Sequence, residues 1–241
     1  MTNGFRNVVS AELVKLRTLP AALITIVTTV LGAALLAVVL AAGRERLGGS
    51  PSAVEAALGV VEYAQFGFVL LGILAAASEY GGGQIRTTLA AVPGRGLLMA
   101  GKAIACTVTM SLTALLTIGV CLLAARLTPG MSWSGGHAGG PAGAWAYLTL
   151  IGLLGHAVAA LLRDLIAALV TMLALVLVVP PVLAGLTTSA GYLPSLAGMR
   201  MYALGPAPQD GLTPVQGAAV LTGWLVLALA AALVSFLRRD A

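Results

Sequence analysis

The sequence predicts an all-α membrane protein that crosses the bilayer about six times. Of its 241 residues, 59% are hydrophobic and only 9% are charged, whereas an ordinary globular domain carries about 25% charged residues. The apolar residues fall in long runs, separated by short charged or Gly/Pro-rich breaks, which is typical of a polytopic membrane protein. A soluble protein of this length could not remove so much apolar surface from water. The composition therefore excludes a soluble enzyme.

The length leaves room for one transmembrane domain over residues 1–241. Each span needs about 20 residues, and no predicted loop approaches the roughly 50 residues that a folded soluble domain requires. We divide the domain into a cytoplasmic helix (1–19), spans one and two (20–78), a cytoplasmic segment (79–102), and spans three to six with a short cytoplasmic C-terminus (103–241).

The N-terminal region is predicted to contain a surface helix followed by the first span. The apolar run Pro20–Ala42 is longer than the hydrophobic core of a signal peptide, so it is predicted to span the membrane and not to be cleaved. In Gly4–Arg17, apolar residues fall near one helical face and polar ones opposite, although Glu12 and Val14 interrupt the pattern. This predicts an amphipathic helix on the membrane surface; a frayed basic tail is the alternative.

The remaining predicted spans are Val60–Ser78, Ala103–Ala125, Ala144–Leu162, Leu165–Leu186 and Pro214–Leu237. Arg163-Asp164 separates the fourth from the fifth, and two adjacent charges in hydrocarbon are costly, so a tight turn at an interface is expected there. Pro180-Pro181 should break or kink the fifth span. A short interfacial helix is expected near Leu193–Tyr202.

Lysine and arginine predict the orientation, because they are enriched in cytoplasmic loops. With the N-terminus inside, nine of the 13 basic residues are cytoplasmic and the C-terminus is also inside. The cytoplasmic set is Arg6, Lys15, Arg17, Arg86, Arg95, Lys102, Arg163, Arg238 and Arg239, and the outer set is Arg44, Arg46, Arg126 and Arg200.

Few ionisable residues fall within the predicted spans. Glu62 lies near the outer end of the second span, and His156 lies nearer the inner end of the fourth. Glu62 is expected to be an interfacial carboxylate and His156 a helix–helix hydrogen-bonding residue; a proton relay or metal ligand is the alternative for His156. The spacing supports no metal site, no paired carboxylates and no catalytic triad, so no catalytic residue is assigned.

Gly96–Lys102 matches the first seven positions of a phosphate-binding loop. Such a loop requires Ser or Thr after the lysine to hold Mg²⁺, and here the next residue is Ala103. It also requires a preceding buried strand, whereas the residues before it are polar and include Pro93. Nucleotide binding on this chain is therefore not expected, and no nucleic-acid partner is indicated.

The segment after the second span reads Ser-Glu-Tyr-Gly-Gly-Gly-Gln-Ile-Arg-Thr-Thr-Leu over residues 78–89 and continues to Pro93-Gly94-Arg95. It resembles the corresponding loop of permeases in the ABC type-2 exporter family, although Gln84 stands where Thr is usual and Gly94 replaces an Arg. The Ser10–Arg17 stretch resembles the family's N-terminal elbow helix. Leu161–Asp164 followed by Ile166–Ala168 resembles its turn between spans four and five, and the ending Arg238–Ala241 resembles its C-terminus.

The resemblance implies the membrane subunit of an ATP-driven exporter in a bacterial cell membrane, surrounded by membrane lipid. A cytoplasmic ABC ATPase would carry the ATP and Mg, this chain would hold no cofactor, and a second permease chain would complete the pathway. The residues implied to couple the permease to the ATPase are Glu79, Tyr80, Gln84, Ile85, Arg86, Thr87, Thr88 and Leu89, and those of the elbow helix are Glu12, Lys15 and Arg17.

Within the coupling segment, Ile85 and Leu89 are four residues apart and would share one face of a short helix. Glu79 is expected to fix the angle of the segment by pairing with Lys102 or Arg95. The substrate would be a drug, antibiotic, peptide or lipid. An ion-coupled secondary transporter and a non-transporting membrane subunit are the alternatives; most span centres lack the charges that ion coupling usually requires.

Overall fold

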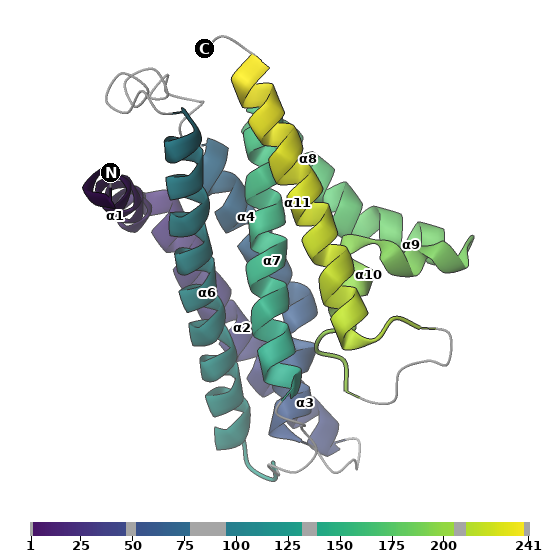
Figure 1. Cartoon of the computed structure of the whole chain (residues 1–241). Helices are drawn as coiled ribbons and strands as arrows, with labels where there is room; N and C mark the ends of the chain where they lie inside the picture. The colour runs from purple at the N-terminus through teal and green to yellow at the C-terminus, as the bar shows by residue number, and fades with distance from the viewer. Residues whose placement is uncertain (1, 47–51, 78–94, 132–138, 205–210, 239–241) are drawn as a thin grey trace.

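The computed structural model describes residues 2–46, 52–77, 95–131, 139–204 and 211–238, and this part of the chain forms helices without any β-strand. The long helices run side by side as a bundle (Figure 1). Five of its helical segments are long and apolar enough to cross a membrane, and a sixth is obtained if a bent helix pair counts as one span. The predicted all-α class is thus confirmed, and the five or six candidate spans fit a membrane protein. The long helices are α2 (Pro20–Arg46), α6 (Arg95–Leu127), α7 (Gly139–Leu162) and α11 (Pro214–Arg238).

The N-terminal helix, α1 (Thr2–Thr18), is continuous and lies across the bundle, not along it (Figure 1). It packs against α6 and α2. Val8 and Leu16 are buried, whereas Arg17 is exposed. The chain therefore forms a helix here and not a frayed tail.

The second span differs from the prediction, which began it at Val60. The structure has α3 (Ala53–Gly59) followed by α4 (Val61–Ala77), with a bend of 43° between them. Gly59 is a poor helix former, and the Val60 backbone N–H bonds to the Ala57 carbonyl in a tighter turn. Because α3 is rich in buried alanines, it packs closely against α6.

The helix α7 is the centre of the bundle, and its most extensive contact is with α4. Glycines permit this close approach: a Cβ built on Gly72 would lie 2.0 Å from the Gly152 carbonyl oxygen, and one on Gly155 would lie 2.9 Å from the Val69 carbonyl oxygen. Small residues at helix contacts are typical of membrane bundles, where close packing replaces the hydrophobic effect as the driving force.

The helix that contains the third predicted span, α6, starts at Arg95, before the predicted start of the span at Ala103. Residues 95–102, which were assigned to the cytoplasmic segment, are its first two turns. Gly96–Lys102 is therefore helical, which differs from the open loop that cradles a phosphate. The fourth span also starts earlier, at Gly139, because Pro141 is tolerated in the first turn of a helix.

The predicted tight turn between spans four and five is present. Arg163 adopts a left-handed backbone conformation with φ of 56°, and Asp164 caps the next helix, α8 (Leu165–Leu173), by accepting a hydrogen bond of 2.7 Å from the Ala167 N–H. The Arg163 guanidinium donates to the Ser235 carbonyl on α11 at 3.3 Å. The two charges thus end one span and begin the next.

The fifth span is irregular, as the two prolines predicted. After α8 the chain forms a π-helical turn, η1 (Ala174–Val178), and then α9 (Val179–Ala184). Pro180 and Pro181 cannot donate the backbone hydrogen bonds that would continue a regular helix. Figure 1 shows α9 turning away from the bundle. Two short helices, η2 (Thr188–Tyr192) and α10 (Pro194–Met199), follow in the region of the predicted interfacial helix, and α10 packs against α11.

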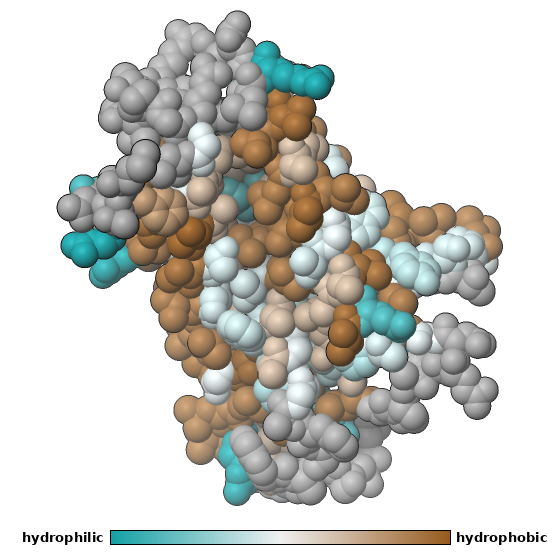
Figure 2. Space-filling model, viewed as in Figure 1, coloured by the Kyte–Doolittle hydropathy of each residue, from teal (hydrophilic) through white to brown (hydrophobic). Residues whose placement is uncertain are grey.

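The outside of the bundle is largely apolar. In Figure 2 hydrophobic residues cover much of the visible face, and strongly hydrophilic residues are few and lie mostly towards its margins. Leu31 and Leu35 on α2 and Leu227 on α11 are among the large apolar side chains that are exposed. A surface of this kind is stable in contact with lipid or with another apolar chain, and unfavourable in contact with water.

Candidate functional site

The contact between α1 and α6, which we call the α1–α6 junction, contains a buried ion pair. The Lys102 Nζ lies 3.0 Å from both carboxylate oxygens of Glu12, and each residue is only 9% exposed. The helices approach closely beside this pair, because a Cβ on Gly101 would lie 2.6 Å from a Val8 methyl carbon. A buried charge is tolerated when it is paired and hydrogen-bonded in this way.

The ion pair explains why Glu12 interrupts the amphipathic pattern of the first helix. Its side chain points into the junction and meets a lysine 90 residues away. The expected pairing of Glu79 with Lys102 or Arg95 involves a residue outside the described ranges and stays a prediction; within those ranges Lys102 pairs with Glu12. Of the other two predicted elbow residues, Lys15 is half-buried and Arg17 is exposed. All the predicted coupling residues, from Glu79 to Leu89, lie outside the described residues.

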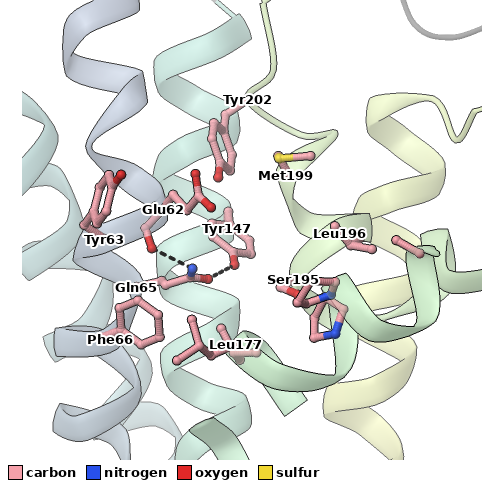
Figure 3. Close-up of a pocket in the computed structure, with 14 residues that line it drawn as sticks. Glu62, Tyr63, Gln65, Phe66, Tyr147, Leu177, Ser195, Leu196, Met199 and Tyr202 are labelled. Atoms are coloured by element: carbon pink, nitrogen blue, oxygen red, sulfur yellow. Dashed lines mark hydrogen bonds between the residues drawn. The ribbon is translucent and has the colours of Figure 1, made fainter. Parts of the chain in front are cut away.

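A second site surrounds Glu62, at the start of α4. A cavity of about 370 Å³ lies there between α4, α7, the broken fifth span and α10 (Figure 3). We call it the tyrosine cavity. It is lined by Glu62, Tyr63, Gln65, Phe66, Tyr147, Val176, Leu177, Pro180, Pro181, Ala184, Ser195, Leu196, Met199 and Tyr202. The broken fifth span contributes to its wall through η1 and α9.

Hydrogen bonds and ring packing hold one side of the tyrosine cavity. The Tyr147 hydroxyl donates to the Gln65 Oε1, and the Gln65 Nε2 donates to the Glu62 backbone carbonyl at 2.6 Å. The rings of Tyr147 and Tyr202 pack with their centroids 5.3 Å apart. Figure 3 shows the Glu62 carboxylate pointing towards these two tyrosines. The wall is thus pre-organised around the carboxylate.

The Glu62 carboxylate has no cationic partner among the residues that the structure describes. Burial raises the pKa of the Tyr202 hydroxyl, and the nearby Glu62 charge raises it further. Because the hydroxyl stays protonated, it can act as a hydrogen-bond donor. The cavity therefore combines an acidic group with aromatic and apolar walls.

His156 lies elsewhere in the bundle. It is 5% exposed, and its backbone nitrogen lies beside Gly72 on α4. Gly72 follows Glu62 by ten residues, or about 15 Å along a helix, so the structure does not bring the two predicted intramembrane polar residues together. Within the described ranges, no group of three or more His, Cys, Asp or Glu side chains is arranged to hold a metal ion.

Sequence reasoning missed both clusters. The signal for the ion pair was Glu12, the one acidic residue in an otherwise basic amphipathic helix at the N-terminus. The tyrosine cavity has a weaker signal, since Gln65, Tyr147 and Tyr202 are far apart in sequence and each resembles an ordinary interfacial residue. Comparison with protein-family models finds no match, and comparison with curated proteins finds no significant one.

Proposed function

We propose that the chain is the membrane-spanning permease subunit of an ATP-driven exporter of the ABC type-2 kind. Two such chains would form the pathway, a cytoplasmic ABC ATPase would supply the energy, and both termini would be cytoplasmic in a bacterial cell membrane. The proposed cargo is an amphiphilic small molecule, a drug or antibiotic, a peptide or a lipid.

The observation that carries this proposal is the ion pair of the α1–α6 junction. In the proposed exporter, α1 is the elbow helix and the segment before α6 receives the ATPase. Such an exporter requires a rigid connection between α1 and the first turns of α6. A movement that the ATPase imposes on the segment before α6 would then displace both helices together. The buried Glu12–Lys102 pair and the tight Gly101–Val8 contact would supply that connection.

The test is ATP hydrolysis by the complex. The tagged chain, purified from its native membranes in mild detergent, should carry a stoichiometric ABC ATPase and hydrolyse ATP, whereas the chain expressed alone should not. Ile85→Asp and Arg86→Glu should lose both the ATPase and the activity by removing an apolar anchor and a charge contact. Ile85→Leu and Arg86→Lys serve as matched controls.

Two results would contradict the proposal. One is the absence of any ATPase from a stable purified chain. The other is saturable ATP binding by the chain alone that is lost on Lys102→Ala, because the nucleotide site would then be on this subunit. If Ile85→Asp and Arg86→Glu both retained a wild-type complex, the coupling role of residues 84–89 would be wrong even where an ATPase is present.

A further inference from the structure

The tyrosine cavity presents an unusual combination for an apolar bundle. Glu62 places a carboxylate at the cavity without a cationic partner in the described part of the chain. Glu62 is exposed, so its carboxylate is accessible to a ligand, and beside apolar and aromatic walls it attracts a positive charge more strongly than it would in bulk water. The cavity lining therefore favours a ligand that brings the charge with it.

The aromatic residues favour the same kind of ligand. Phe66, Tyr147 and Tyr202 line the cavity on the side of Glu62. Aromatic rings attract cations through their negative faces, most strongly when the cation carries little water. Small hydrated ions fit poorly, because Leu177, Leu196 and Met199 line much of the remaining wall and give no oxygen ligands.

We propose that the tyrosine cavity binds an organic cation with apolar substituents, such as a quaternary ammonium or phosphonium ion, with Glu62 as its counter-ion. The volume of about 370 Å³ lies within the range of small-molecule sites, roughly 300–1,000 Å³. The Ser195 Oγ, buried beside the cavity, has no hydrogen-bond partner within the described residues and is available to a polar group of the ligand.

The same chemistry could come from a soluble cation or from the choline headgroup of a lipid. Binding at this cavity requires no ATPase, so the purified chain alone is sufficient for the test. Failure of cation binding would leave the exporter proposal standing, and absence of an ATPase would leave the cation site standing.

The experiment measures binding of radiolabelled tetraphenylphosphonium to the purified chain in phosphatidylglycerol nanodiscs. Tetraphenylborate, which has the same shape and the opposite charge, is the matched competitor. Saturable cation binding is expected, and the borate should not displace it. Glu62→Gln should weaken binding at least about tenfold, because it removes the counter-ion. Glu55→Gln, on α3 and outside the lining, should leave binding unchanged.

A second pair of variants tests the aromatic contribution independently of Glu62. Tyr202→Leu should weaken binding about fivefold or more, whereas Tyr202→Phe keeps the ring and should change it by less than about threefold. Size-exclusion profiles verify that each variant is folded. Equal binding by wild type, Glu62→Gln and Tyr202→Leu, or equal displacement by the borate, would overturn the proposal, since the probe would then only be partitioning into apolar surface.

Repeating the measurement in phosphatidylcholine nanodiscs separates the two sources. Competition by this lipid in the wild type identifies the choline headgroup as the ligand, and unchanged binding identifies a soluble cation. Both results support the cation chemistry of the cavity.

Discussion

At the residue scale, Glu12 and Lys102 depend on each other. Each is almost buried, so removing either one breaks the ion pair and leaves a buried charge that has lost this partner. We expect Glu12→Gln or Lys102→Met to lower the free energy of unfolding by about 3 kcal/mol. SDS titration in mixed micelles would measure this change. Arg17→Gln, an exposed change on the same helix, should cost less than about 0.5 kcal/mol.

The charge-swapped double variant Glu12→Lys with Lys102→Glu distinguishes pairing from a simple need for polarity. If the pair stabilises the junction, the swap should recover most of the loss, because both charges again have a partner. A double variant that is no more stable than the single ones would contradict this account.

At the element scale, the crossing of α4 and α7 depends on glycine. A methyl group at Gly72 would meet the Gly152 carbonyl oxygen at 2.0 Å, and a backbone atom can move only if the helices separate. We expect Gly72→Ala to destabilise the protein by about 2 kcal/mol, measured by the same SDS titration. Gly32→Ala on α2, where nothing lies within 4 Å of the added carbon, should be neutral or slightly stabilising. Similar losses at both positions would contradict a packing role for Gly72.

The fifth span is the other element with functional consequences. Its π-helical turn directly precedes Pro180 and Pro181, and together they turn α9 away from α7 and α11 (Figure 1). A straight helix here would place different side chains against Tyr147 and Glu62. The prolines therefore contribute to the shape of the tyrosine cavity as well as lining it.

At the scale of the whole molecule, we expect both ends of the chain to face the cytoplasm. A membrane-impermeant maleimide should label Pro129→Cys and Thr213→Cys in intact cells, and Arg17→Cys and Arg238→Cys only after permeabilisation. Native Cys106 and Cys121 are free cysteines but buried, so their background labelling by the maleimide should be low. Labelling of Arg238→Cys but not of Arg17→Cys in intact cells would mean an odd number of crossings, and labelling of either in intact cells would contradict the orientation.

Much of the helical framework could be predicted from the sequence, because the determining signals are local. Long apolar runs predicted the spans, the adjacent charges of Arg163-Asp164 predicted the turn that Asp164 caps, and Pro180-Pro181 predicted the break in the fifth span. The differences lie at helix starts. Residues 95–102 were placed in the cytoplasmic segment, and in the structure they form the first two turns of α6, where Lys102 pairs with Glu12 on α1.

The sequence by itself thus determined the all-α class and the approximate position of each candidate span, since hydropathy and helix-breaking residues act within a few neighbours. Only the tertiary structure decided which helices meet. It joined Glu12 to Lys102 across 90 residues and Gln65 to Tyr147 across 82, and it formed a cavity around Glu62. In an apolar bundle, pairing depends on small residues and on a few buried polar groups, and hydropathy carries no information about which of these face one another.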